Sequence, residues 1–211
     1  MTLKSGRPKN DSKSRQKIID AAAKIISDGR AEEITVRKVC EIADVSIGTF
    51  YHYFNDKDGL MMYFLREAFY GSELKIPLRD IAARITELYM QLINKYMKLG
   101  KNFMKSFYTT NNNSLSAYMC EHDGKFLSDT IMARSEREIN EAVNSGIIKS
   151  DSNVHLICQD ICTIVKGCVF EWCLNNSKID IEMTLNRIIK NYLSTYIKNE
   201  EQEKNPNPSL K

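Results

Sequence analysis

Apolar residues recur at three- and four-residue spacing along nearly the whole chain, and this spacing constrains the fold more than any other sequence feature. Near the N-terminus, for example, Ile18, Ile19, Ala22, Ile25 and Ile26 share one stripe of a helix. The sequence has no strand-like alternation of any length. We therefore expect an all-α fold.

Capping and breaking residues divide this pattern into separate helices. Near the N-terminus we expect helices over about 12–28, 35–43, a stretch that follows Ser46, and about 55–70. Later helices are expected over about 77–99, 103–108, 115–145 with a bend near Gly124, 154–174 and 181–197. The predicted domains are a basic arm (1–11), a small helical domain (12–72), a larger helical domain (73–198) and a disordered tail (199–211).

The composition is that of an ordinary globular protein, since 43% of the 211 residues are hydrophobic and 27% are charged. No apolar run approaches the roughly 20 residues of a membrane span, and the N-terminus lacks the apolar region of a secretory signal. We therefore expect a cytoplasmic protein that does not enter a membrane. In that compartment the six cysteines should be free thiols.

No Ser-His-Asp set, paired carboxylates or Gly-rich phosphate loop stands out, so the sequence predicts neither an enzyme nor a bound cofactor. Six basic residues against the single acid Asp11 lie between Met1 and Lys17. Such a segment suits binding to nucleic-acid phosphates, and it equally suits a solvated tail.

The segment "VSIGTFYHYFNDKDGL", Val45 to Leu60, follows a short helix after a three-residue turn. Two short helices joined in this way form a helix-turn-helix unit, whose second helix enters the major groove of DNA. On a helical wheel Phe50 and Phe54 face the core, and Tyr51 and Tyr53 lie at the two edges. The remaining face is expected to meet DNA.

Residues that offer hydrogen bonds, apolar contact or close backbone approach on this unit are the candidate DNA contacts. Gly48, Thr49 and His52 fall opposite the core, and Lys57 follows the helix as a phosphate ligand. The full set is Arg37, Ser46, Ile47, Gly48, Thr49, Tyr51, His52, Tyr53 and Lys57.

The segment "ITVRKVCEIADVSIGTFYHYFNDKDGLM" resembles the helix-turn-helix signature of the TetR/AcrR family of transcriptional regulators. It shares the T-V-x-x-V/I opening, the A-x-V-S turn, the G-T-x-Y-x-Y/H-F helix and the x-x-K-x-x-L that follows. The resemblance covers about residues 12–72. Three positions depart from the usual pattern: Asp44 replaces a turn glycine, Ile47 a polar or basic residue, and His52 a tyrosine.

The resemblance implies a homodimeric repressor that binds a palindromic operator and is released by a small-molecule effector, whose identity the sequence does not give. The last two helices would form the dimer, with candidate interface residues Val165, Val169, Trp172, Leu185, Ile188 and Tyr192. The middle helices would hold the effector. Their large apolar residues favour a mostly apolar ligand, with candidates Tyr89, Met97, Phe103, Phe107, Tyr118, Met119 and Phe126.

Two alternatives stay open at this point. His155, Cys158 and Cys162 lie on one face of the helix over 154–174, where they would suit metal binding or thiol sensing, although small buried hydrophobes are the plainer interpretation. The other alternative is a helical interaction module without specific DNA binding. The presence of Thr49, Tyr51 and Lys57 speaks against it.

Overall fold

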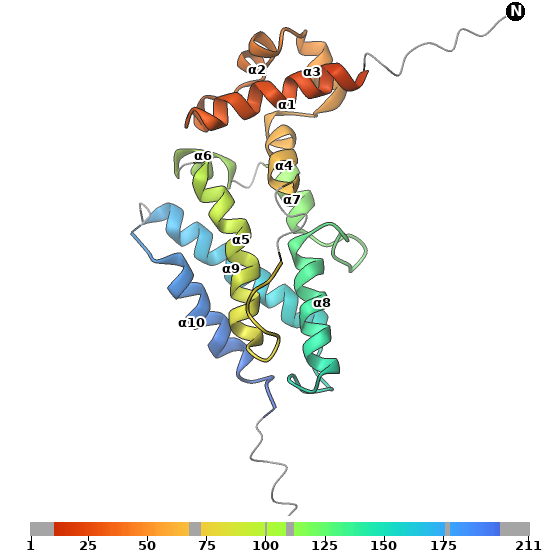
Figure 1. The fold of residues 1–211 in the computed structure, drawn as a ribbon, viewed down its shortest axis with the longest axis vertical. Coiled ribbons are helices and arrows are strands. Elements are labelled where there is room, and N and C mark those ends of the chain that lie inside the picture. The colour runs from red at the N-terminus through yellow and green to blue at the C-terminus, as the bar shows by residue number, and fades with distance from the viewer. Residues whose placement is uncertain (1–10, 68–72, 100, 109–111, 176–177, 199–211) are drawn as a thin grey trace, which may run out of the picture. The chain divides into compact units, whose positions relative to one another are not determined.

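The computed structural model describes residues 11–67, 73–99, 101–108, 112–175 and 178–198. Within these ranges the chain forms helices joined by turns and two isolated β-bridges, so the all-α prediction is confirmed (Figure 1). The predicted tail over 199–211 and, apart from Asp11, the predicted arm over 1–11 fall outside the described residues. None of the described helices combines the length and apolar character needed to cross a lipid bilayer.

The chain forms two compact units. Unit 1 contains Met1–Tyr70 and Leu92–Glu121, and unit 2 contains Gly71–Gln91 and His122–Lys211. Helix α5 (Ile81–Lys98) contributes its first part to unit 2 and its last part to unit 1. The domain division at residue 72 stays a prediction.

Unit 1 begins with a small helical bundle in which α1 packs against both α2 and α3 (Figure 1). Its fully buried side chains include Ile18, Ile25, Val39, Phe50 and Leu60. The elements are α1 (Asp11–Ser27), the short 3-10 helix η1 (Ala31–Glu33), α2 (Val36–Ala43), α3 (Ile47–Tyr53) and α4 (Lys57–Glu67).

The other helices of unit 1 are α6 (Lys101–Phe107) and α7 (Asn113–Met119). Helix α7 packs on α4, and α6 contacts η1. The approach of α4 to α7 is close at Gly59, where an added Cβ would lie 3.5 Å from the Ser114 hydroxyl.

In unit 2, α9 (Val154–Leu174) packs between α8 (Ile131–Asn144) and α10 (Ile181–Leu193). Elsewhere in unit 2, polar side chains of α5 bind the chain segment that precedes α5. Glu87 accepts hydrogen bonds from the backbone N–H groups of Lys75 and Ile76 at 3.0 and 2.9 Å. Arg84 pairs with Glu138 of α8 at 2.7 Å and also donates to the Ile76 carbonyl.

The helix predicted over 115–145 is wrong as a single element, because the chain leaves helical geometry between α7 and α8. Asp123 and Gly124 both have positive φ, 51° and 69°, which an α-helix does not allow. They form a tight turn in which His122 and Lys125 exchange backbone hydrogen bonds. Thr130 then starts α8, since its hydroxyl accepts from the Ala133 N–H.

Two helix boundaries also differ from the sequence prediction. Helix α5 begins at Ile81 rather than near Pro77, because Asp80 accepts a hydrogen bond from the Ala83 N–H and caps the helix there. Helix α10 ends at Leu193 rather than Ile197, and Ile197 instead forms a β-bridge with Ile148.

Candidate nucleic-acid interface

The turn between α2 and α3 depends on a left-handed residue. Asp44 adopts φ 53° and ψ 54°, and its N–H donates to carbonyls of the preceding turn of α2. Aspartate tolerates this conformation better than most residues, which explains how it occupies a position usually held by glycine. The Val45 N–H then donates to the Cys40 carbonyl at 3.1 Å, which completes the end of α2.

Ser46 caps α3 and also hydrogen-bonds to Thr49, one of the predicted DNA contacts. Its hydroxyl accepts the Thr49 N–H at 3.0 Å and lies 2.8 Å from the Thr49 hydroxyl oxygen. This second hydrogen bond fixes the side-chain rotamer of Thr49. The Thr49 oxygen retains lone-pair capacity for a further partner such as a base amino group.

The exposed face of α3 contains Ile47, Gly48, Tyr51 and His52. Ile47 and Tyr51 are 50% and 54% exposed, although both are large hydrophobic side chains. At Gly48, an added Cβ would meet the Ser46 hydroxyl at 3.7 Å, so the outer side of the helix is open there. This face therefore offers apolar contact and one imidazole to a partner, and it allows the backbone to approach closely.

The opposite side of α3 is fixed in the core, as the wheel predicted. Phe50 is fully buried and Phe54, which caps the helix, is nearly so, with ring centroids 5.7 Å apart. Thr49 and Tyr53 are half-buried at one edge, and the Tyr53 ring contacts that of His52 at 4.8 Å. The helical wheel predicts that Thr49 faces outward, but its hydrogen bond with Ser46 holds the side chain half-buried at the edge of this face.

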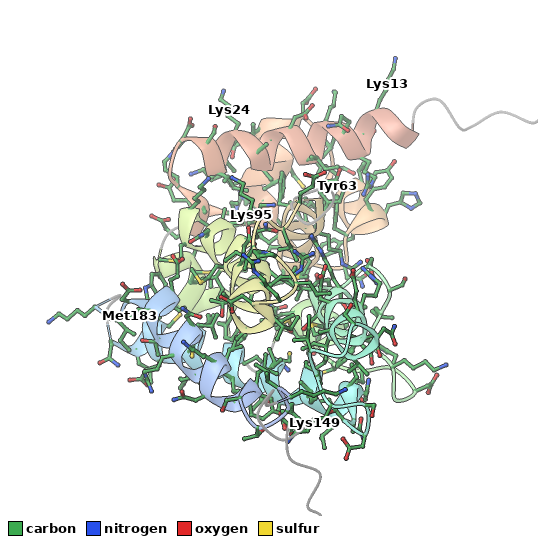
Figure 2. All side chains as sticks on the ribbon, turned by 60° about the horizontal axis from the view of Figure 1, so that its bottom comes forward. Lys13, Lys24, Tyr63, Lys95, Lys149 and Met183 are labelled. Carbon is green, nitrogen blue, oxygen red and sulfur yellow. The ribbon has the colours of Figure 1, made fainter. Side chains whose placement is uncertain are left out.

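The basic residues of the interface come from three helices. Arg37 is exposed on α2, and Lys57 is the first residue of α4 rather than part of a turn. Asp56 caps α4 by accepting the Gly59 N–H at 2.7 Å. Lys13 and Lys17 are exposed on α1, so part of the predicted basic segment is helical; Lys13 projects away from α1 (Figure 2).

The candidate effector residues are distributed over both units and are mostly buried. In unit 1, Phe103 and Phe107 stack at 5.3 Å, and the guanidinium of Arg66 on α4 lies 5.2 Å from the Tyr118 ring centroid. Met119 is buried and Met97 is half-buried. In unit 2, Tyr89 is fully buried, and the half-buried Phe126 ring lies 4.7 Å from that of His155.

The candidate dimer residues are largely covered within the single chain. Val165, Val169, Trp172 and Leu185 are buried, and Ile188 and Tyr192 are half-buried. The Tyr192 hydroxyl donates to Asp160 at 2.6 Å, and burial together with this bond raises the pKa of Tyr192.

The exposed apolar surface of the last two helices is formed by other residues, which are not among the interface residues predicted from the sequence. These are Leu156, Phe170 and Leu174 on α9 and Met183 on α10, which projects outward in Figure 2. Between the two helices lies an apolar groove of about 270 Å³, lined in part by Ile164, Gly167, Ile181 and Ile188. The sequence did contain one signal, because Leu156, Phe170 and Leu174 fall on a single face of one predicted helix.

The geometry around the cysteines does not favour a metal site. The His155 Nδ1 lies 2.8 Å from a carboxylate oxygen of Glu136, and within the described residues no three side chains of metal-binding type come together. Cys158 and Cys162 are buried. Burial raises the pKa of the Cys158 thiol to about 12, which keeps it protonated and unreactive at neutral pH.

Residues 18–63 match the bacterial regulatory proteins of the tetR family. A relative from Bacillus subtilis (strain 168), named fatty acid metabolism regulator protein, is 24% identical over 204 residues, which cover 89% of this chain and 95% of the relative.

Solved structures of similar fold include Thermus thermophilus FadR, a TetR-family repressor in complex with lauroyl-CoA, with a TM-score of 0.63 and 16% identity over 93% of this chain and all of that one. Another is RolR in complex with resorcinol, with a TM-score of 0.57 and 15% identity over 97% of this chain and 100% of that one.

Proposed function

Because residues 18–63 place this chain in the tetR family of bacterial transcriptional regulators, we propose that it is a cytoplasmic, homodimeric repressor that leaves its operator when an effector binds. The observation that carries this proposal is the α3 surface, where Ile47, Gly48, Tyr51 and His52 face outward from a capped, rigid helix. Such a face suits base-edge contacts in a major groove, and Arg37 and Lys57 beside it suit phosphate contacts. The role is regulatory and not catalytic.

The test is selection from random duplex DNA by the purified full-length protein at two salt concentrations. A dimer with two α3 helices is expected to enrich an inverted repeat whose half-sites lie about one helical turn or more apart. Weak and unselective binding that disappears at higher salt would contradict the proposal and favour an interaction module without specific DNA binding.

The effector we propose is a fatty acyl thioester of coenzyme A. Two observations support this class: the B. subtilis relative is named as a regulator of fatty acid metabolism, and the T. thermophilus structure contains lauroyl-CoA. In this chain, Phe103, Phe107 and Met119 are buried apolar side chains among which an acyl chain would insert, and Arg66 brings a positive charge beside Tyr118. An apolar tail with an anionic head matches this combination of residues.

Release of the selected operator in a titration would test the effector class. Lauroyl-CoA is expected to release DNA at micromolar concentrations, and coenzyme A alone or laurate alone should have little effect. Resorcinol, found in another protein of similar fold, is the aromatic control. Release by resorcinol but not by lauroyl-CoA would overturn the acyl-thioester assignment and leave the DNA-binding proposal intact.

A thiol- or metal-sensing regulator is the weaker candidate, because Cys158 and Cys162 are buried and His155 is bound to Glu136. Operator binding that responds to zinc or peroxide and loses this response in Cys158→Ser would restore it.

A further inference from the structure

Arg15 lies where three elements of unit 1 meet. Its guanidinium carbon is 4.7 Å from the centroid of the Tyr63 ring on α4 and 5.7 Å from that of Phe54, which caps α3. Both distances lie within the roughly 6 Å over which the face of an aromatic ring attracts a cation. Arg15 and Tyr63 are each half-buried, so the contact is packed on one side and reached by water on the other.

The rings around Arg15 continue into the DNA-reading helix. Tyr63 and Phe54 meet edge to face, with centroids 6.5 Å apart, and Phe54 lies against the fully buried Phe50 of α3. Phe54 is therefore fixed to the core of the reading head, whereas Tyr63 belongs to α4. A displacement of α4 relative to α1 would remove the closer of the two ring contacts of Arg15.

The charge around Arg15 indicates what its guanidinium is available for. It lies on α1 between Lys13 and Lys17, both exposed, and among the described residues no carboxylate pairs with it. Stacking on a ring uses the flat face of a guanidinium and leaves N–H donors along its edge. Lys13 and Lys17 share one exposed face of α1, whereas Arg15, two residues from each, lies on the side that meets the aromatic rings. The edge donors of its half-buried guanidinium are thus available to a separate phosphate.

We infer that Arg15 binds a DNA phosphate and that the Tyr63 ring positions it, so that affinity for DNA depends on where α4 lies. The inference rests on the proposed function. A stacked guanidinium has fewer rotamers to lose when it binds a phosphate, so the ring strengthens the contact without touching DNA. An effector that displaces α4 would separate Tyr63 from Arg15 and weaken operator binding through this one side chain.

The test compares variants of the full-length protein on its selected operator over a series of salt concentrations. Tyr63→Leu should weaken binding about two- to fivefold, as expected for one partly exposed cation–π contact, and leave the salt dependence unchanged. Tyr63→Phe keeps the ring and should bind like the wild type. Arg15→Gln should lower the slope of log K against log salt by about 1, because one phosphate contact is lost.

Arg15→Lys separates charge from stacking without altering Tyr63. It should keep the wild-type salt slope and weaken binding as much as Tyr63→Leu does. In the Arg15→Gln background, Tyr63→Leu should have no further effect. Lys13→Gln is the matched control, since it removes one charge from the same helix, and there Tyr63→Leu should still weaken binding about two- to fivefold.

Equal effects of Tyr63→Leu in the Arg15→Gln and Lys13→Gln backgrounds would overturn the inference, as would an unchanged salt slope in Arg15→Gln. The melting temperature of each variant is measured in parallel, and Arg15→Lys gives the answer by itself if Tyr63→Leu does not fold. A wild-type protein that selects no DNA sequence would instead overturn the proposed function, so the two failures are distinguishable.

Discussion

At the scale of single residues, His52 is the exposed side chain of α3 best suited to choose between base pairs, because its imidazole can donate and accept hydrogen bonds. We expect His52→Ala to change the preferred half-site at one or two positions while non-specific binding stays the same. Repeating the selection experiment with the variant measures this. An unchanged consensus would show that His52 does not contact a base.

Lys57→Ala should act differently, because we expect this lysine at the start of α4 to contact the phosphate backbone, which is the same in every sequence. Binding should weaken uniformly across operators and unrelated DNA, and the salt slope should fall by about 1. Fluorescence anisotropy at several salt concentrations measures both quantities. A change confined to the operator would assign Lys57 to base reading instead.

Thiol reactivity separates the one exposed cysteine from five buried ones. Cys120 is exposed, and a thiol such as Cys158, with a pKa of about 12, is about one part in 10⁴ thiolate at pH 8. The native protein should therefore react rapidly with one equivalent of a thiol reagent, and all six cysteines should react after unfolding. Cys120→Ser should abolish the rapid phase. Rapid labelling of Cys158 would revive the thiol-sensing alternative.

The individual DNA-contact candidates were predictable to the extent that helical periodicity decides which side of α3 is buried. Periodicity placed Phe50 and Phe54 in the core, and both are buried. It could not place Thr49, because a hydrogen bond between two side chains holds that residue at an edge. It also could not bring Arg15 to Tyr63, since that contact joins residues far apart in sequence.

At the scale of elements, the turn between α2 and α3 sets the angle of the reading helix and contains a strained residue. Asp44→Gly removes the steric cost of a side chain at φ 53° and should stabilise the protein by up to about 1 kcal/mol. Gly29→Ala is the matched control, because it adds a side chain at a left-handed position, whereas Asp44→Gly removes one. Its φ is 72°, and an added Cβ meets nothing within 4 Å, so the expected loss of about 1 kcal/mol comes from the backbone alone.

Thermal unfolding measures both changes, and each 1 kcal/mol corresponds to a shift of roughly 2–4 °C for a chain of this size. A lower melting temperature in Asp44→Gly would mean that the Asp44 side chain makes a stabilising interaction that outweighs its backbone cost.

Element boundaries were less predictable than element type. The apolar spacing of 115–145 continues on both sides of the Asp123–Gly124 turn, so periodicity alone joined α7 and α8 into one helix. The sequence "HDGK" carries the turn signal, because Asp-Gly tolerates two successive positive φ values. Local turn chemistry overrides a periodic pattern at such a site, and it does so again where Asp80 delays the start of α5.

At the scale of the whole molecule, the proposed affinity for an inverted repeat requires two copies of the chain, and we expect α9 and α10 to supply the surface that joins them. Leu156, Phe170 and Leu174 form an exposed apolar stripe on α9, and Gly167 opens onto the groove beside it. An added Cβ at Gly167 meets nothing within 4 Å in its own chain, so a larger residue there should not disturb the folded protomer. Any effect of such a residue on assembly must then come from the second copy.

Gly167→Leu is accordingly expected to raise the melting temperature of the protomer slightly, since leucine favours a helix by about 0.8–1 kcal/mol over glycine. If a helix of the partner packs at Gly167, as we expect, the new side chain should weaken dimerisation at least tenfold. Sedimentation velocity over a range of concentrations measures this. Asn140→Leu, at an exposed position on α8, adds similar apolar bulk elsewhere and should leave the dimer intact.

Because a monomer retains one reading head, Gly167→Leu should bind a half-site normally and lose most of its preference for the inverted repeat. A Gly167→Leu protein that dimerises as tightly as the wild type would place the interface on another surface.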